Sequence, residues 1–375
     1  MIILKRTIED NIDKYLKNKD VKTLFIWGPR RSGKTTLIDK LAQKLKVKKY
    51  NFDLESDREK FSPRRKVLEK ISKENKIILI DEVQNYPEVT VMLKLLHDEF
   101  KVKVIATGSS ELRQKSSKEF DTMAGRFNEI YCLPLSISEI TNNEKPLTKD
   151  LQIFGAYPEV YIKNDLNEKD QIDILQHMLD AYVLKDVIDI YDLKNTKLAK
   201  DILTKIALQL GSEVSIREIA DSLGASASTV SNYIEIFIKN YILISLPSFK
   251  TNIRKAVSEN RKLYFYDLGI RNILIQDFRD LELRQDKGGV FENFIISELE
   301  KRRKLTNAKV NMYFYREYGG KEIDLVIEDY KKKYTTVEIK SNKGTANKIF
   351  PLPNTSITIT AQNYFDKIIG IIEDE

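Results

Sequence analysis

The chain has little of the two residue types that build disulfides and most zinc sites. Its 375 residues include one cysteine, Cys132, and two histidines, His97 and His177. A single cysteine excludes an internal disulfide framework, and this supply of cysteine and histidine is too small for a zinc site of the usual kind. Any metal ion bound by this chain is therefore expected to be held by carboxylates and phosphates.

Long apolar runs are also missing. No stretch of the sequence approaches the roughly 20 apolar residues of a membrane-spanning helix. The opening residues lead into charges, beginning with Lys5 and Arg6, and not into the apolar core and cleavage site of a signal peptide. We therefore expect a soluble, cytoplasmic protein without membrane contacts.

The length of the chain indicates how many domains to expect, and its basic charge indicates the kind of partner. At 375 residues the chain exceeds the size at which one hydrophobic core usually stops growing, so we expect about two to four domains. Lysine and arginine outnumber aspartate and glutamate, which gives a net charge of +7 and a pI near 9.0. This balance favours a polyanionic partner such as DNA, although a solvated lysine-rich surface without a partner has the same composition.

A glycine-rich motif follows the first strand-like run of the chain. Residues 24–27 are apolar, and they lead directly into the pattern Gly-x-x-x-x-Gly-Lys-Thr. In this context the glycines let backbone amides surround phosphate groups, and the next helix presents its positive N-terminus to them. A glycine turn with an incidental lysine is the alternative. The residues predicted to bind ATP are Gly28, Pro29, Arg30, Arg31, Ser32, Gly33, Lys34, Thr35 and Thr36.

Further strand-like runs continue the pattern of an α/β domain. They alternate with helix-length amphipathic stretches and cover residues 48–52, 76–80, 102–106 and 129–133. Compact apolar runs at this spacing predict a parallel sheet covered on both faces. We place this P-loop ATPase domain at residues 1–140. At residues 141–205 apolar residues recur at helical spacing, so we expect a helical lid or connector there.

Two carboxylates follow directly after the run that ends at Ile80, namely Asp81 and Glu82. The carboxyl ends of parallel strands form the edge at which ligands bind. We expect Lys34 to reach the β and γ phosphates there, and the hydroxyl of Thr35 to bind Mg²⁺. Asp81 is expected to complete the Mg²⁺ shell, and Glu82 to polarise the attacking water as the catalytic residue. A solvated strand end is the alternative.

Two further candidates belong to the same site. The run that ends at Ala106 is followed by Thr107, Ser109 and Ser110. Each of these could contact the γ phosphate or the attacking water, or merely cap the following helix. Arg126 is a candidate arginine finger to a neighbouring subunit of a homo-oligomer, or a sensor within its own chain. A structural salt bridge is the alternative for Arg126.

Residues 206–284 have the pattern of a winged helix. A capping box that begins at Ser215 opens a short helix, a second helix follows after a glycine turn, and two strand-like runs complete a hairpin. The second helix is expected to expose Ser228, Thr229, Ser231, Asn232 and Lys239. Such side chains are able to meet phosphates and base edges, although the same scaffold also serves for protein packing.

Residues 285–375 carry a second set of charged residues. A helix that opens near Glu292 is followed by one strand with Asp324 and another with Glu338 and Lys340. If the two strands pair, their polar face presents these side chains to one point, which suits Mg²⁺ or Mn²⁺. Asp324 and Glu338 are the predicted metal ligands, completed by Glu292. Lys340 is the predicted catalytic lysine, which orients water or stabilises charge on phosphate. A wet strand pair whose charges neutralise each other is the alternative.

Taken together, the motifs resemble those of a widespread archaeal and bacterial family of AAA-type ATPases. The resemblance rests on residues 28–36, 79–87, 107–110, 124–126, 133–136 and 155–159. It covers essentially the full chain and implies a second half made of a winged helix and a domain related to PD-(D/E)XK nucleases. Ala156 departs from the pattern of the family, which usually has glycine there. Asp324, Glu338 and Lys340 take the three motif positions of the nuclease core, with Ile323 in place of the proline.

We therefore expect a multidomain α/β protein with an AAA-type ATPase core, a helical lid, a winged helix and a nuclease-like domain. The expected function is ATP-regulated binding and processing of DNA, with metal-dependent cutting at Asp324 and Glu338. The alternative is a nucleotide-dependent switch that assembles with protein partners and carries an inert nuclease-like domain.

Overall fold

The computed structural model describes most of the chain. The described residues are 4–108, 123–143, 149–162, 166–186, 195–250, 261–317, 320–341 and 349–372. They form two compact units, the first spanning Lys5–Leu133 and the second taking in the chain from Pro134 onward. No helix among these residues is long and apolar enough to cross a membrane.

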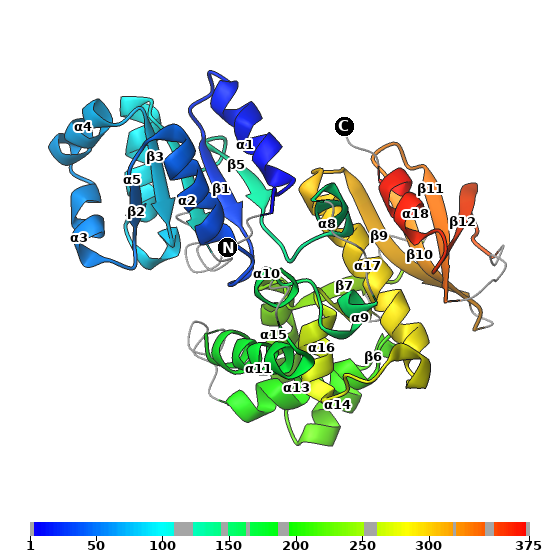
Figure 1. Ribbon diagram of the computed structural model, residues 1–375. Helices are drawn as coiled ribbons and strands as arrows, with labels where there is room; N and C mark the ends of the chain where they lie inside the picture. The colour runs from blue at the N-terminus through cyan, green and yellow to red at the C-terminus, as the bar shows by residue number, and fades with distance from the viewer. Residues whose placement is uncertain are drawn as a thin grey trace. The chain divides into compact units, whose positions relative to one another are not determined.

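The first unit is built on a five-stranded sheet in which every neighbouring pair of strands is parallel (Figure 1). The strands are β1 (Thr23–Trp27), β2 (Lys49–Asn51), β3 (Ile77–Asp81), β4 (Lys103–Gly108) and β5 (Phe127–Tyr131), in the order β2-β3-β4-β1-β5. The parallel sheet that the sequence predicts is confirmed. β5 begins and ends two residues earlier than the predicted run at residues 129–133.

Helices follow the strands of this unit in alternation. They are α1 (Ile8–Lys17), α2 (Lys34–Leu45), α3 (Glu55–Arg58), α4 (Arg65–Glu74) and α5 (Val89–Leu95). All five residues of β1 are buried, as expected for a central strand covered on both faces. The side chains of Phe25 and Trp27 stack in this core with their ring centroids 4.7 Å apart.

The second unit begins with helices. They are α8 (Ile137–Asn142), α9 (Asp150–Ile153), α10 (Pro158–Tyr161), α11 (Glu168–Met178), a π-helical turn (Leu179–Asp186) and α13 (Thr196–Leu208). This agrees with the helical pattern of the sequence between residues 141 and 205. The role of this region as a lid stays a prediction.

A small three-stranded sheet and two helices follow. The elements are β6 (Glu213–Val214), α14 (Ile216–Leu223), α15 (Ala227–Lys239), β7 (Leu243–Pro247), β8 (Arg261–Phe265) and α16 (Leu268–Ile275). Ser215 Oγ, at the start of the predicted capping box, accepts from the amide of Glu218 at 3.2 Å. Ser226 Oγ caps the next helix by accepting from the amide of Thr229 at 3.1 Å. The strands are antiparallel in the order β6-β8-β7.

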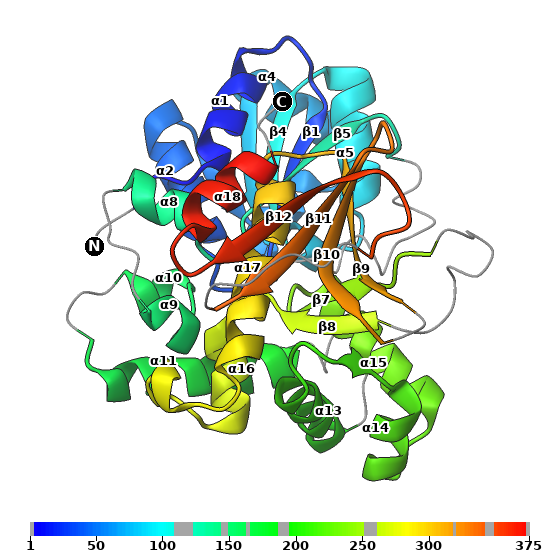
Figure 2. The ribbon, with the colours of Figure 1, turned by 90° about the vertical axis from the view of Figure 1, so that its right-hand side faces the viewer.

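The last elements form a mixed sheet with two helices (Figure 2). They are α17 (Lys287–Leu305), β9 (Val310–Arg316), β10 (Glu322–Asp329), β11 (Tyr334–Lys340), β12 (Asn354–Thr360) and α18 (Tyr364–Ile371). β10 is antiparallel to both β9 and β11, whereas β11 and β12 are parallel. α17 packs on β11 and also on β8 of the small sheet, and the amide of Phe249 donates to the carbonyl of Phe314 at 2.6 Å. The two sheets therefore belong to one compact unit, although the sequence separates them at residue 284.

Candidate nucleotide site and a C-terminal charge cluster

The shape of the loop between β1 and α2 requires glycine at two positions. A Cβ on Gly28 would lie 1.9 Å from the carbonyl oxygen of Cys132, so no other residue fits there without movement of the backbone. Gly33 has a φ of 98°, which L side chains rarely adopt. The structure thus places Gly28, Pro29, Arg30, Arg31, Ser32 and Gly33 in this loop, and Lys34, Thr35 and Thr36 in the first turn of α2.

Lys34 lies inside the loop. Its side chain is 4% exposed, and its ammonium donates to the carbonyl oxygens of Gly28 and Pro29 at 3.0 and 2.8 Å. Burial lowers the pKa of Lys34, and the nearby carboxylate of Glu82 opposes that change. A buried cation whose hydrogen bonds go to carbonyl oxygens gains much from an anion, because phosphate oxygens compensate its charge better than neutral groups do.

Asp81 and Glu82 lie at the same edge of the sheet as the loop. β1 and β3 both flank β4 in parallel, so their carboxyl ends meet on one side. Asp81 is 2% exposed and accepts a hydrogen bond from the hydroxyl of Thr107. The same hydroxyl accepts from the amide of Glu82 at 3.3 Å, and the Glu82 carboxylate accepts from the side chain of Gln84. Ser109 and Ser110 lie outside the described residues.

Arg126 does not join this group. It precedes β5 at the start of the strand, where the amide of Thr23 donates to the carbonyl of Arg126 at 2.9 Å and Phe127 lies opposite Thr23. The phosphate loop leaves the other end of β1, about 15 Å away at roughly 3.3 Å per residue. The guanidinium of Arg126 instead binds Asp98 at 2.9 Å and, with His97, lowers the pKa of Asp98 to about 2. The structure therefore does not support Arg126 as a sensor at its own phosphate loop. A role across a subunit boundary stays a prediction.

Arg6 is a contact of the phosphate loop that the sequence did not reveal. Its side chain is 6% exposed and donates to the carbonyl oxygen of Ser32 at 2.7 Å, inside the loop. It also donates to the carbonyl oxygen of Leu133 at 2.6 Å and to the sulfur of Cys132 at 3.4 Å. The guanidinium thus joins the loop to the last residues of the first unit.

Two ion pairs hold α1 beside α2 in the same region. Lys40 lies 2.7 Å from Glu9, and Lys44 lies 2.7 Å from Asp13. The two acids are four residues apart on α1, and the two lysines are four residues apart on α2. The acids therefore lie on one face of α1 and the lysines on one face of α2. This matched spacing was the available sequence signal that α1 packs beside the helix of the phosphate loop.

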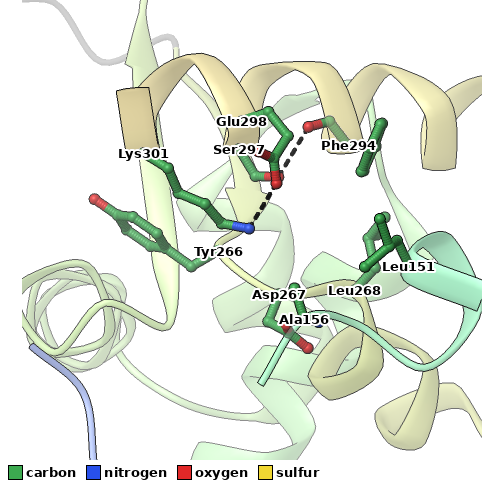
Figure 3. A pocket seen from close by; sticks show the side chains of 9 residues that line it. All are labelled: Leu151, Ala156, Tyr266, Asp267, Leu268, Phe294, Ser297, Glu298 and Lys301. Atoms are coloured by element: carbon green, nitrogen blue, oxygen red, sulfur yellow. Dashed lines mark hydrogen bonds and ion pairs between the residues drawn. The ribbon is translucent and has the colours of Figure 1, made fainter. Parts of the chain in front are cut away.

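The segment after Leu133 is held by buried charges within the second unit. Lys301 donates to the carbonyl oxygen of Leu135 at 3.0 Å and pairs with Glu298 at 2.7 Å, a pair drawn at the wall of a small pocket in Figure 3. The other oxygen of Glu298 accepts from the amide of Ile137 at 2.9 Å. Leu135 belongs to residues 133–136, which the sequence singles out without a role, and with Ile137 it attaches the chain to α17.

Residues 155–159 also have a structural role. The amide of Ala156 donates to Asp267 at 2.7 Å, and its carbonyl oxygen accepts from the amide of Leu135 at 2.8 Å. Gly155 has a φ of 79°, and a Cβ there would lie 2.0 Å from Asp267. Ala156 contributes hydrogen bonds through its backbone alone, which explains why alanine can stand where glycine is usual.

The paired strands β10 and β11 bring together the predicted residues of the last domain. Leu325 lies opposite Val337, and the amide of Ile339 donates to Asp324 at 2.7 Å. The ammonium of Lys340 lies 3.1 Å from Glu338 and 3.7 Å from Asp324. Burial, and next to it the charge of Glu292, raises the pKa of Asp324 to about 7.

A second lysine enters this group from another sheet. Lys262 of β8 is 1% exposed, and its ammonium lies 3.2 Å from Glu292 and in contact with Glu322. Burial alone would lower the pKa of Lys262, but Glu292 and Glu322 raise it overall. We call this group the C-terminal charge cluster; its members are Lys262, Glu292, Glu322, Asp324, Glu338 and Lys340.

The cluster does not assemble the predicted metal site. In the part of the chain that the structure describes, no three or more Asp, Glu, His or Cys side chains are grouped so that they could hold a metal ion. Asp324 and Glu338 are hard oxygen donors, but Lys340 lies between them, and Glu292 is bound to Lys262 and Tyr264. The predicted ligand set therefore does not fit a metal ion in this structure, because ammonium groups already compensate its charge.

A comparison with known protein families agrees with the P-loop fold of the first unit. Residues 20–141 match the family model described as AAA domain. Residues 145–282 and 287–351 match two families described as domains of unknown function, DUF8612 and DUF4143. The chain therefore contains a P-loop ATPase domain of the AAA type, followed by regions without an assigned activity.

Relatives along most of the chain have no described function. One uncharacterized protein of Methanocaldococcus jannaschii is 27% identical over 91% of this chain and 82% of its own length. An uncharacterized protein of Haemophilus influenzae is 24% identical over 70% of this chain and 72% of its own length.

Two solved structures are similar to parts of this chain. The Walker-type ATPase PABY2304 of Pyrococcus abyssi has 14% identity and a TM-score of 0.46, covering 73% of this chain and 96% of that one. The RuvB Holliday junction branch migration motor of Thermotoga maritima has 18% identity and a TM-score of 0.29, covering 64% of this chain and 90% of that one. At these TM-scores neither structure bears on the function of this chain.

Proposed function

We propose that this protein hydrolyses ATP at the phosphate loop and uses the nucleotide cycle to act on DNA through its second unit. One observation supports the proposed hydrolysis of ATP. The phosphate loop, Lys34 and the carboxylates of Asp81 and Glu82 meet at a single edge of a parallel sheet. This is the edge at which α/β sheets bind ligands.

The residues of this edge have complementary roles in hydrolysis. The amides of the loop and the N-terminus of α2 bind the phosphates, and Lys34 exchanges its carbonyl partners for phosphate oxygens. Thr35 and the buried Asp81 fit a Mg²⁺ ion, which supplies charge compensation to the phosphates when it is bound. Glu82 orients the attacking water and accepts its proton. Thr107 fixes Asp81 and the backbone of Glu82 in the same place.

Two variants test these roles. Lys34→Ala is expected to abolish tight nucleotide binding, whereas Glu82→Gln is expected to bind ATP and not to hydrolyse it. Binding is measured with a fluorescent ATP analogue and hydrolysis by phosphate release. Lys44→Met serves as a control on the same helix, because Lys44 only pairs with Asp13 at the surface. Normal turnover in Glu82→Gln would refute the role of that residue.

DNA is the proposed partner because of charge and of the second unit's architecture. The chain carries a net charge of +7. The order α13-β6-α14-α15-β7-β8 supports the proposal of a winged helix, and α15 exposes Ser228, Asn232 and Lys239 at its surface. Polar side chains on such a helix reach phosphates and base edges in DNA-binding proteins.

The test of DNA binding uses labelled single-stranded, duplex and branched DNA, each with and without ATP and Mg²⁺ or Mn²⁺. Binding that weakens steeply with salt is expected, because neutralised phosphates release counterions. ATP hydrolysis is expected to rise when the preferred DNA is present. Binding that does not depend on salt, or no binding to any of the three, would refute this half of the proposal.

A second candidate is a nucleotide-dependent switch that assembles with protein partners. The specific observation in its favour is the C-terminal charge cluster, in which lysines compensate the carboxylates of the predicted nuclease site. Metal-dependent cutting by Asp324, Glu338 and Lys340 stays a prediction, and the same DNA incubations test it. Cutting that is lost in Asp324→Ala while ATP hydrolysis persists would establish it.

A further inference from the structure

We propose that Lys262 is the built-in cation of the C-terminal charge cluster. Its ammonium lies beside Glu292, which the nuclease hypothesis assigns to a divalent metal ion, and beside Glu322. The cluster is then complete without a metal, and it accepts one only when the charge of Lys262 is removed. This inference does not depend on ATP hydrolysis by the first unit.

The position of Lys262 supports this role. The residue pairs in the small sheet with Glu213 of β6 and Leu246 of β7, and its side chain leaves that sheet toward α17 and β10. The ammonium lies 3.2 Å from Glu292 Oε1 and in contact with Glu322 Oε1. Its other side is covered by the ring of Phe314, whose centroid is 5.6 Å away. A side chain with 1% exposure in this position is enclosed by its partners.

The carboxylates are placed by further groups, so the site is built around the lysine. Tyr264 donates to Glu292 at 2.5 Å, and Arg316 donates to Glu322 at 2.8 Å. Gly211 leaves space for the Glu292 carboxylate, since a Cβ there would lie 2.9 Å from Glu292 Oε2. The φ of 77° at Gly211 also disfavours any L side chain. Tyr264, Arg316 and Gly211 thus hold the two carboxylates in positions where both contact the same ammonium group.

Ammonium and a divalent ion exclude each other here. Both need the same two carboxylate oxygens, Glu292 Oε1 and Glu322 Oε1, so a divalent ion at this position would have to displace the ammonium. Lys340 has the corresponding position between Asp324 and Glu338. Removal of Lys262 would take away the ammonium partner of Glu292 and one of the cationic partners of Glu322, which is costly unless another cation replaces it.

The test is chemical rescue by a metal ion. Lys262→Met keeps the length of the side chain and removes its charge, so the melting temperature is expected to fall. Addition of Mn²⁺ is expected to restore part of the loss in the variant and to leave the unmodified protein unchanged. Calorimetric titration with MnCl₂, without nucleotide and in a Lys34→Ala background, is expected to show at least tenfold tighter Mn²⁺ binding by the variant. The Lys34→Ala background removes the nucleotide site as a source of the signal.

Two further variants keep the test decisive. Lys332→Met removes an exposed lysine from its pair with the buried Glu328 at 2.9 Å, and no metal response is expected there. If Lys262→Met does not fold, Lys262→Met with Glu322→Gln is used, because one carboxylate fewer reduces the repulsion. This double variant is expected to fold and still to bind Mn²⁺ more tightly than the unmodified protein.

Two results would overturn the proposal. One is that the unmodified protein binds Mn²⁺ in the cluster as tightly as the variant does. The other is that a folded Lys262 variant shows no response to the metal. ATP hydrolysis is measured on the same samples, and its absence from the unmodified protein would refute the proposed function without affecting the metal readout.

Discussion

Replacement of Arg6 by methionine tests whether the phosphate loop depends on contacts from outside its motif. Arg6 is 6% exposed and donates to Ser32 and Leu133 at 2.7 and 2.6 Å. A hydrogen bond from a charged donor contributes about 1.5–3 kcal/mol, so the loss of both is expected to destabilise the first unit by about 3–6 kcal/mol. Arg6→Lys keeps the charge but lacks the planar fork that reaches both carbonyls, and about half of that loss is expected.

The assay for stability is urea unfolding followed by tryptophan fluorescence. Trp27 is the only tryptophan of the chain and is buried in the core of the first unit, so its signal reports that unit. Because Ser32 is part of the loop, the KM for ATP is also expected to rise, about tenfold for each 1.4 kcal/mol that falls on the loop. Lys40→Met is the control, since its half-exposed pair with Glu9 contributes about 1 kcal/mol or less.

Two outcomes would contradict this reasoning. Unfolding of Arg6→Met at the urea concentration of the unmodified protein would show that the buried guanidinium does not stabilise the first unit. A lower stability with an unchanged KM would show that Arg6 supports the fold of the unit and not the shape of the loop.

Three further predictions concern other parts of the chain. Gly155→Ala is expected to destabilise the second unit by about 1–2 kcal/mol from its positive φ alone, and by more because the new Cβ would meet Asp267. Ala156→Gly is its matched control in thermal unfolding, and an equal loss in both variants would contradict this explanation. If Arg126 acts across a subunit boundary, mixing Arg126→Ala chains with Lys34→Ala chains is expected to restore part of the ATP hydrolysis. No recovery in demonstrably mixed oligomers would exclude that role. The affinity for DNA is expected to fall about 10³-fold or more between 50 and 200 mM salt if at least six phosphates are contacted, and a flat salt profile would exclude such binding.

The parallel sheet and the nucleotide site could be predicted because their signals are local. The loop, its lysine and the helix that follows are contiguous in sequence, and Asp81 directly follows a run of buried residues. In an α/β sheet, the carboxyl ends of parallel strands meet at one edge whatever the loops between them do. A residue that directly follows such a strand is therefore placed correctly by the sequence alone.

The sequence did not predict the positions or partners of three cationic residues, Arg126, Arg6 and Lys262. Arg126 precedes its strand instead of following it, which places it at the far edge of the sheet from the loop. Arg6 and Lys262 act through partners far along the chain, Leu133 and Glu322 among them. The residues next to Arg6 and Lys262 in the sequence form no motif that indicates such a partner. From the sequence alone, a buried lysine or arginine of this kind cannot be distinguished from one at the surface.

The chain is attached on both sides of the point where the first unit ends and the second begins. Arg6 binds the carbonyl of Leu133 and Lys301 binds that of Leu135, so only Pro134 lies between the two attachments. Proline fixes its own φ near −65°, which leaves few torsion angles free at this point. A flexible linker adds free torsion angles in proportion to its length, whereas the segment between these two attachments has few. Lengthening the chain here would therefore add free torsion angles between the two attachments without altering any residue of either site.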